Sequence, residues 1–154
     1  MNDQNKAVLV FSIVHKAMLA GQILLVVVFL YLISATDYKP GMVAMDRLFQ
    51  IIALVLAAAG FFAGRILFKN KIAQLKEKQS AAKDKFIIYR SVCIVQWALL
   101  EGPCIFSGVV FFLTGNYAFL GLAIVLITLF ALRSPSKNKV AQDLGLTDQE
   151  IADL

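Results

Sequence analysis

One apolar run, from Arg90 to Leu113, constrains the fold of this chain most. A helix of about 20 apolar residues crosses the hydrocarbon core of a bilayer, and this run is long enough to do so. It nevertheless carries one carboxylate, Glu101, near its middle, followed directly by Gly102 and Pro103. Because a charged group at that depth is costly, a carboxylate inside a membrane span is a candidate functional residue.

Three further apolar blocks and the composition predict an all-α integral membrane protein with four helices. Hydrophobic residues make up 60% of the chain and charged residues only 16%. Long apolar blocks of this kind are typical of membrane helices. The predicted helices cover 7–33, 48–68, 90–113 and 117–132. We expect a four-helix transmembrane domain over 1–133 and a tail over 134–154.

The distribution of Lys and Arg predicts the orientation in the membrane. Segment 69–90 is rich in lysine, whereas the turn between the third and fourth helices carries no basic residue. Cytoplasmic loops are enriched in Lys and Arg. We therefore expect a multi-pass protein of the inner (plasma) membrane, with both termini and a basic loop over 69–90 in the cytoplasm. This loop either binds anionic lipid headgroups or only obeys the positive-inside rule. Because it contains no Pro or Gly, it could also continue both flanking helices past the membrane. The net charge of +5 thus reflects orientation and not binding to nucleic acid.

The C-terminal tail is predicted to contain short amphipathic helices. Pro135 ends the fourth helix, because the residue before a proline is driven out of the helical conformation. Thr147 and Glu150 have the spacing of a capping box ahead of Ile151 and Leu154.

The sequence contains no constellation typical of an enzyme, a metal site or a cofactor site. Its two cysteines, Cys93 and Cys104, lie in one apolar block, and we expect them to be free, buried thiols. The only histidine, His15, stands beside Lys16 at the predicted edge of the first span, where we expect it to be solvated. We therefore predict a protein without enzymatic activity.

An internal repeat relates the two halves of the chain. Residues 65–74 match residues 133–142, and both segments follow an even-numbered helix. Two tandem helical hairpins inserted the same way up would form a parallel repeat. In this alignment Ala20 is the counterpart of Glu101, so only one hairpin carries the carboxylate.

An ion site around Glu101 is the main functional hypothesis. Pro103 has no backbone N–H, so it frees the carbonyl of Leu99. We expect Gln22 at a similar depth on the first helix, and Ser107 lies further along the third helix. Carboxylate, carbonyl, amide and hydroxyl oxygens could together bind a proton or a small cation. Equally, a protonated Glu101 bound to Gln22 could only fix the register of the helices.

A face of small residues predicts where helices pack closely. Ala57, Gly60 and Gly64 recur at helical spacing on the second helix, and Gly102 offers a similar close approach on the third. Small residues let helix backbones approach where no hydrophobic force drives association. This face is either a generic packing surface or the interface of a homo-oligomer or a larger membrane complex.

The second and third helices also carry two short motifs of a known hairpin. Gly64-Arg65 closes the second helix, and Glu101-Gly-Pro-Cys-Ile-Phe106 follows in the third. With segment 69–90 between them, they resemble the hairpin of the proteolipid (c) subunit of rotary ATP synthases and vacuolar-type ATPases. The resemblance implies that Glu101 carries a proton or a sodium ion. The alternative is a structural or accessory subunit that transports nothing.

Overall fold

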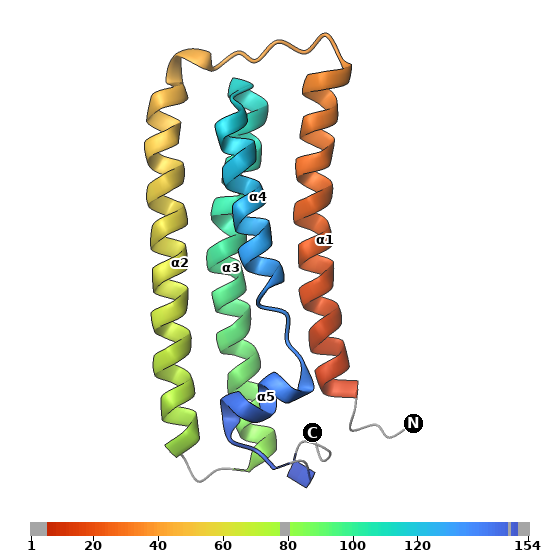
Figure 1. The fold of residues 1–154 in the computed structure, drawn as a ribbon, viewed down its shortest axis with the longest axis vertical. Helices are drawn as coiled ribbons and strands as arrows, with labels where there is room; N and C mark the ends of the chain where they lie inside the picture. Colours follow the sequence, from red (N-terminus) through yellow and green to blue (C-terminus); the bar gives the residue numbers. More distant parts are fainter. Residues whose placement is uncertain (1–5, 78–80, 148, 151–154) are drawn as a thin grey trace.

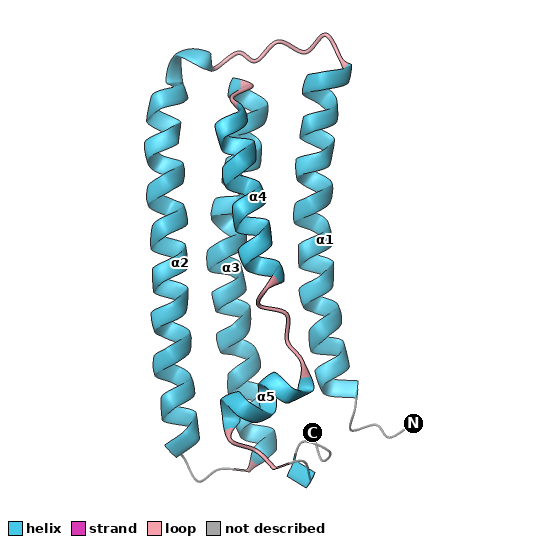
Figure 2. Ribbon diagram, in the orientation of Figure 1, coloured by secondary structure: helices cyan, strands magenta, loops and turns pink. Residues whose placement is uncertain are grey.

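The computed structural model describes residues 6–77, 81–147 and 149–150, which form a bundle of helices (Figure 1). Within this described part, Figure 2 shows helices and loops but no strand. The elements are α1 (Lys6–Ala35), the short 3-10 turn η2 (Val43–Met45), α2 (Asp46–Glu77), α3 (Ala82–Thr114), α4 (Tyr117–Ala131) and α5 (Lys137–Leu144). The prediction of an all-α fold is confirmed.

Helix α3 lies at the centre of the bundle. It packs against α1, α2 and α4. Helices α1 and α2 flank it on opposite sides, and α4 runs along its upper half (Figure 1). The chain runs in one direction through α1 and α3 and in the other through α2 and α4. Because neighbours cover it on three sides, α3 contains the largest buried side chain of the protein, Trp97.

Within the described part of the chain, three helices are long and apolar enough to cross a membrane. They are the helical stretches Ala7–Ala35, Val43–Glu77 and Ala82–Thr114. Their outward faces expose large apolar side chains, for example Leu24 at 65% and Val55 at 60% exposure. A continuous apolar outer surface suits lipid and is rare on soluble monomers. The protein is therefore membrane-embedded.

The fourth predicted span forms a shorter helix. Helix α4 has 15 residues, or about 22 Å of helix, less than the thickness of a typical hydrocarbon core. Beyond it the chain follows an irregular path through Pro135 and enters α5, where Val140 and Leu144 are buried. The hydroxyl of Tyr89 on α3 donates a hydrogen bond of 3.0 Å to Asp143 of α5. The amphipathic α5 is therefore held against the rest of the bundle.

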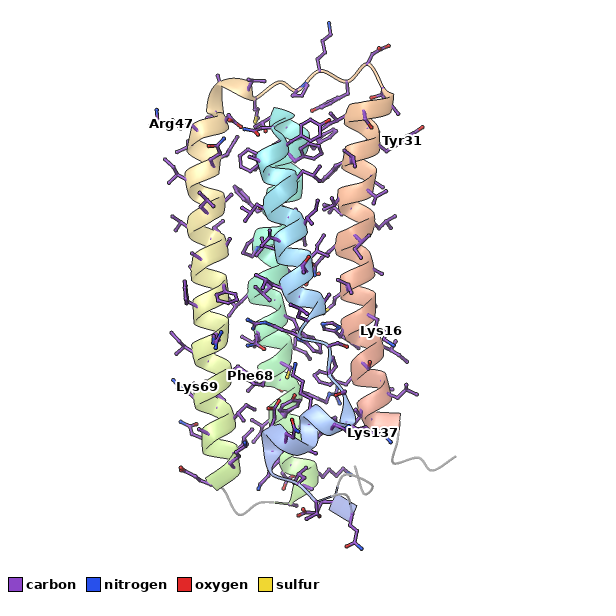
Figure 3. All side chains as sticks on the ribbon, in the orientation of Figure 1. Lys16, Tyr31, Arg47, Phe68, Lys69 and Lys137 are labelled. Carbon is purple, nitrogen blue, oxygen red and sulfur yellow. The ribbon has the colours of Figure 1, made fainter. Side chains whose placement is uncertain are left out.

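The described part of segment 69–90 is largely helical, so the predicted loop between the second and third spans extends both flanking helices. Helix α2 continues to Glu77 and α3 already begins at Ala82. The segment contains no Pro or Gly, and its Lys, Gln, Leu and Ala residues favour helix. Its described lysines therefore lie on two helical extensions, which form, together with α5, the basic end of the bundle. Figure 3 shows Lys69 and Lys137 toward this end and Arg47 at the opposite end.

The opposite end is held by a cluster of hydrogen bonds around the α3–α4 turn. Gly115 adopts a left-handed conformation with φ of 70° and donates its N–H to Phe111 O. Asn116 accepts a hydrogen bond from Ala118 N as the cap of α4, and its side chain donates to Asp46 Oδ2 at 2.7 Å. The start of α2 is thereby fixed to the turn between α3 and α4.

The two copies of the sequence repeat adopt different structures. Residues 65–74 lie within the continuous helix α2, whereas residues 133–142 are divided between the α4–α5 connection and α5. The difference follows from Pro135, which cannot continue a helix, and from Ser136, whose hydroxyl accepts the N–H of Lys139 as the cap of α5.

The predicted tail helices are described in part. The capping box is confirmed, because Thr147 N donates to Glu150 Oε2 at 2.9 Å and Glu150 N donates back to Thr147 Oγ1 at 3.4 Å. Ile151 and Leu154, the predicted apolar residues of the helix after this box, lie outside the described residues.

Candidate functional site

Glu101 lies half-buried at the edge of the outward face of α3. Among the described residues it has no hydrogen-bond or ion-pair partner. Its neighbour Gly102 is exposed, and a Cβ added there would meet no atom within 4 Å. The carboxylate is thus accessible from the side of the bundle and is not enclosed in its core.

The carbonyl of Leu99 faces α2. A Cβ added at Gly60 would overlap the Leu99 oxygen and stand 3.4 Å from Pro103 Cγ. Pro103 cannot donate to this carbonyl, as the sequence predicts, and the Cα of Gly60 fills the space beside it. The Leu99 oxygen therefore lies at a helix–helix contact.

Gln22 and Ser107 also have surroundings different from those expected. Gln22 is 2% exposed, and neither of its amide atoms has a hydrogen-bond partner within the described part of the chain. Leu25 packs against Gly108, which places Gln22 roughly one helical turn further from the basic end than Glu101. Ser107 donates its hydroxyl to Pro103 O at 2.8 Å. The structure thus does not gather the four predicted ion ligands into one coordination sphere, and ion binding stays a prediction.

The predicted packing face divides into two groups. Ala57, Gly60 and Gly64 are buried on the side of α2 that faces α3. The side-chain amide of Gln96 donates to Gly64 O at 3.1 Å across this contact. Gly102, in contrast, is exposed, and together with Gly60 it lines an outward groove of about 540 Å³ between α2 and α3. Gly102 therefore offers space on the outer surface of this chain and not within the bundle.

The prediction that the side chain of His15 is solvated is wrong. It is 1% exposed, stacks on Phe130 with ring centroids 4.6 Å apart, and meets the edge of Trp97 at 4.7 Å. Its Nε2 lies 3.1 Å from Phe130 O, which makes Nε2 the protonated nitrogen. Its Nδ1 has no hydrogen-bond partner among the described residues. His15 is thus a buried link between α1 and the end of α4, and not a solvated interfacial residue.

A periodic pattern in α1 could have revealed this burial. The buried residues of α1 recur every three, four or seven positions along one stripe: Val8, Phe11, His15, Gln22 and Val26. Such spacing marks the core-facing side of a helix. The neighbouring Lys16 is exposed, and its charge was the reason for predicting that His15 lies at the membrane surface.

Comparison with protein-family models, curated proteins and solved structures finds no match to this chain. Within the described residues, no group of His, Cys, Asp and Glu side chains is arranged to hold a metal ion.

Proposed function

We propose that this protein is a membrane subunit in which Glu101 exchanges a proton or a small cation. The observation that carries the proposal is a half-buried carboxylate within a spanning helix that has no protein partner in the described chain. An unpaired charge is costly in a low-dielectric environment. A carboxyl group there gains stability by taking up a proton or a cation, and it can release either one where water or a counter-charge reaches it.

The lateral position of Glu101 supports the likeness to the proteolipid hairpin. A carboxylate at the side of a helix can be loaded and unloaded by a neighbouring chain, whereas one enclosed in the core cannot. One residue does not make a pathway through the membrane. We therefore expect the route to be completed by further copies of this protein or by other subunits of a membrane complex.

The proposal includes a topology. Helix α4 is the fourth span, and its short length is compensated by local thinning of the bilayer. The basic end lies in the cytoplasm, because positively charged segments stay on that side of the plasma (inner) membrane. Its lysines attract anionic lipids.

Labelling with a hydrophobic carbodiimide tests the role of Glu101. This reagent modifies protonated carboxyl groups within membranes, so we expect mass spectrometry to locate the label on Glu101 and labelling to decrease as the pH rises. Glu101→Gln should abolish it, while Glu150→Gln, which removes an exposed tail carboxylate, should leave it unchanged. In proteoliposomes, Glu101→Gln should also abolish proton flux. Absence of labelling, or wild-type flux in Glu101→Gln, would overturn the proposal.

A second candidate is an accessory subunit that transports nothing. The outward groove of about 540 Å³ favours it, because its small residues, including Ala59 and Ala98, leave room for a helix of a second copy. Single cysteines at Ala59 or Ala98 should then form disulfide-linked dimers in membranes. Cross-linking that persists in Glu101→Gln, together with absence of flux in the wild type, would favour this candidate over ion exchange.

A further inference from the structure

A second polar site lies at the basic end, away from Glu101. It is a cleft of about 410 Å³ between α2, α3 and the chain that follows α4. Three cations line it, each from a different element: Arg65 from α2, Arg133 from the α4–α5 connection and Lys139 from α5. Tyr89 and Trp97 of α3 form part of its wall. None of these residues belongs to the ion site predicted around Glu101.

The cleft exists because α4 ends before it reaches the basic end, whereas α2 and α3 extend to that end. Helix α4 ends at Ala131, while α2 and α3 continue toward the basic end (Figure 1). The chain then passes through Pro135 into α5, which packs against α2 and accepts a hydrogen bond from Tyr89 of α3, and the cleft lies between these elements. Arg65 and Arg133 occupy equivalent positions of the sequence repeat. The loss of helix in the second copy is what brings the two arginines to one cavity.

The three cations have no carboxylate bound to them. Within the described residues, no ion pair involves Arg65, Arg133 or Lys139, and Arg133 instead lies 5.4 Å above the ring of Phe61. The nearby Asp143 accepts its hydrogen bond from Tyr89. Burial first, and the positive charge of Arg65 second, lower the pKa of Arg133. Uncompensated positive charge around a partly enclosed space is stabilised by an anion.

We propose that this cleft binds a phosphate group. Two guanidinium groups can each donate paired hydrogen bonds to phosphate oxygens, and a lysine adds a compact third charge. A volume of about 410 Å³ has room for a phosphate ester. The flanking rings of Phe68 and Tyr89, with centroids 6.0 Å apart, supply an apolar side for the rest of the molecule, and Figure 3 shows Phe68 between α2 and α3.

The depth of the cleft allows two sources of the phosphate. Arg65 lies about 28 Å along α2 from Asp46, close to the thickness of a hydrocarbon core. The cleft is therefore at the level of lipid headgroups, at the boundary between membrane and water. The phosphate belongs either to an anionic lipid or to a water-soluble phosphate ester.

Binding measurements on the full-length protein test this site. We would use glycerol 3-phosphate with the protein in neutral detergent, and nanodiscs of phosphatidylcholine with or without phosphatidylglycerol. Binding of glycerol 3-phosphate in detergent would identify a soluble ester. Binding of phosphatidylglycerol alone, seen as lipid retained through purification by native mass spectrometry, would identify a lipid. If neither is bound, the proposal is overturned.

The repeat supplies a matched pair of variants for the same measurement. Lys139→Gln removes a charge that lines the cleft, whereas Lys71→Gln removes the equivalent exposed charge of the first copy on α2. We expect Lys139→Gln and Arg133→Gln each to weaken binding at least about tenfold, and Lys71→Gln to weaken it less than about twofold. Equal losses in all three would indicate diffuse attraction to the basic end and would overturn the site.

A variant that keeps the charge separates binding from folding. Arg133→Lys retains a positive charge but cannot donate paired hydrogen bonds, so we expect intermediate affinity with an unchanged circular dichroism spectrum. Wild-type affinity in both Arg133→Lys and Arg133→Gln would remove Arg133 from the site and contradict the proposed geometry.

Discussion

The Cα of Gly60 lies directly against the backbone carbonyl oxygen of Leu99. This contact joins α2 to α3 at the level where Pro103 leaves the Leu99 carbonyl without its usual helical donor. A residue with a side chain at position 60 would collide with backbone, which cannot move aside as a flexible side chain can. The carbonyl that Pro103 leaves without a donor in α3 is thus covered by Gly60 of α2.

Replacing Gly60 should separate α2 from α3. Alanine favours helix over glycine by up to about 1 kcal/mol, but the steric conflict with the Leu99 carbonyl is larger. We expect Gly60→Ala to lower the free energy of unfolding by a net of about 1–3 kcal/mol, measured by denaturation in mixed micelles.

Two other glycines serve as controls for this variant. A Cβ at Gly64 would meet Gln96 Cγ at 3.4 Å, an ordinary contact, and a Cβ at Gly102 would meet nothing within 4 Å. Gly64→Ala should therefore be close to neutral, and Gly102→Ala should match or exceed the stability of the wild type. Equal destabilisation by all three would contradict the assignment of Gly60 to this contact.

His15 should contribute to stability through its rings and its hydrogen bond. His15→Phe keeps an aromatic ring beside Phe130 and Trp97 but removes the donor to Phe130 O. We expect a loss of about 1 kcal/mol for His15→Phe and about 3 kcal/mol for His15→Ala in the same unfolding assay. Lys16→Gln, an exposed neighbour, should be neutral. A neutral His15→Ala would place this histidine outside the core.

Gln22 and Gln96, the glutamines buried among the described residues, should respond oppositely to replacement by leucine. The amide of Gln22 has no hydrogen-bond partner in the described chain, whereas Gln96 donates to Gly64 O. Removing an unpaired buried amide avoids a desolvation cost of about 1–3 kcal/mol, so Gln22→Leu should raise the free energy of unfolding. Gln96→Leu should lower it. Destabilisation by Gln22→Leu would show that this amide has a binding partner in the membrane.

The pKa of Glu150 should lie below the ordinary value for glutamate. The backbone N–H of Thr147, and next its hydroxyl, donate to this carboxylate and lower its pKa. The capping hydrogen bonds should therefore hold at neutral pH and be lost as the pH falls through this lowered pKa. In an NMR titration, Thr147→Val should raise the pKa only part of the way, because the backbone donor remains. Ser136→Ala, which alters the cap of α5, should not move it.

The helical segments of this protein were predictable because they depend on local sequence. Apolar blocks located α1 to α4, Pro135 located the end of α4, and Thr147 with Glu150 located a capping box. Helices α2 and α3 are longer than the predicted spans 48–68 and 90–113, because the basic segment between these spans, which contains no Pro or Gly, extends both helices. Hydropathy predicts which residues contact lipid, but it does not predict where a helix ends outside the membrane.

The surroundings of the polar residues could not be predicted in the same way. Glu101, Gln22 and Ser107 were expected to share one site, but helical rotation and register direct them to separate surroundings. His15 was expected in solvent, but the stripe that contains Phe11 turns it toward α3 and α4. Small changes in rotation about a helix axis decide such contacts, and no single helix encodes them.

The sequence by itself determined that this protein is helical and embedded in a membrane, and that one helix carries a carboxylate and a proline within a single turn. Each of these properties follows from hydropathy, propensity or the chemistry of a single residue. Only the tertiary structure decided that Gly60 covers the Leu99 carbonyl and that Glu101 stays at the lateral surface. It also brought to one cleft Arg65 and Arg133, which are 68 positions apart in the sequence. These relationships join residues of different helices, and they arise because packing satisfies the shapes and backbone groups of all helices at once.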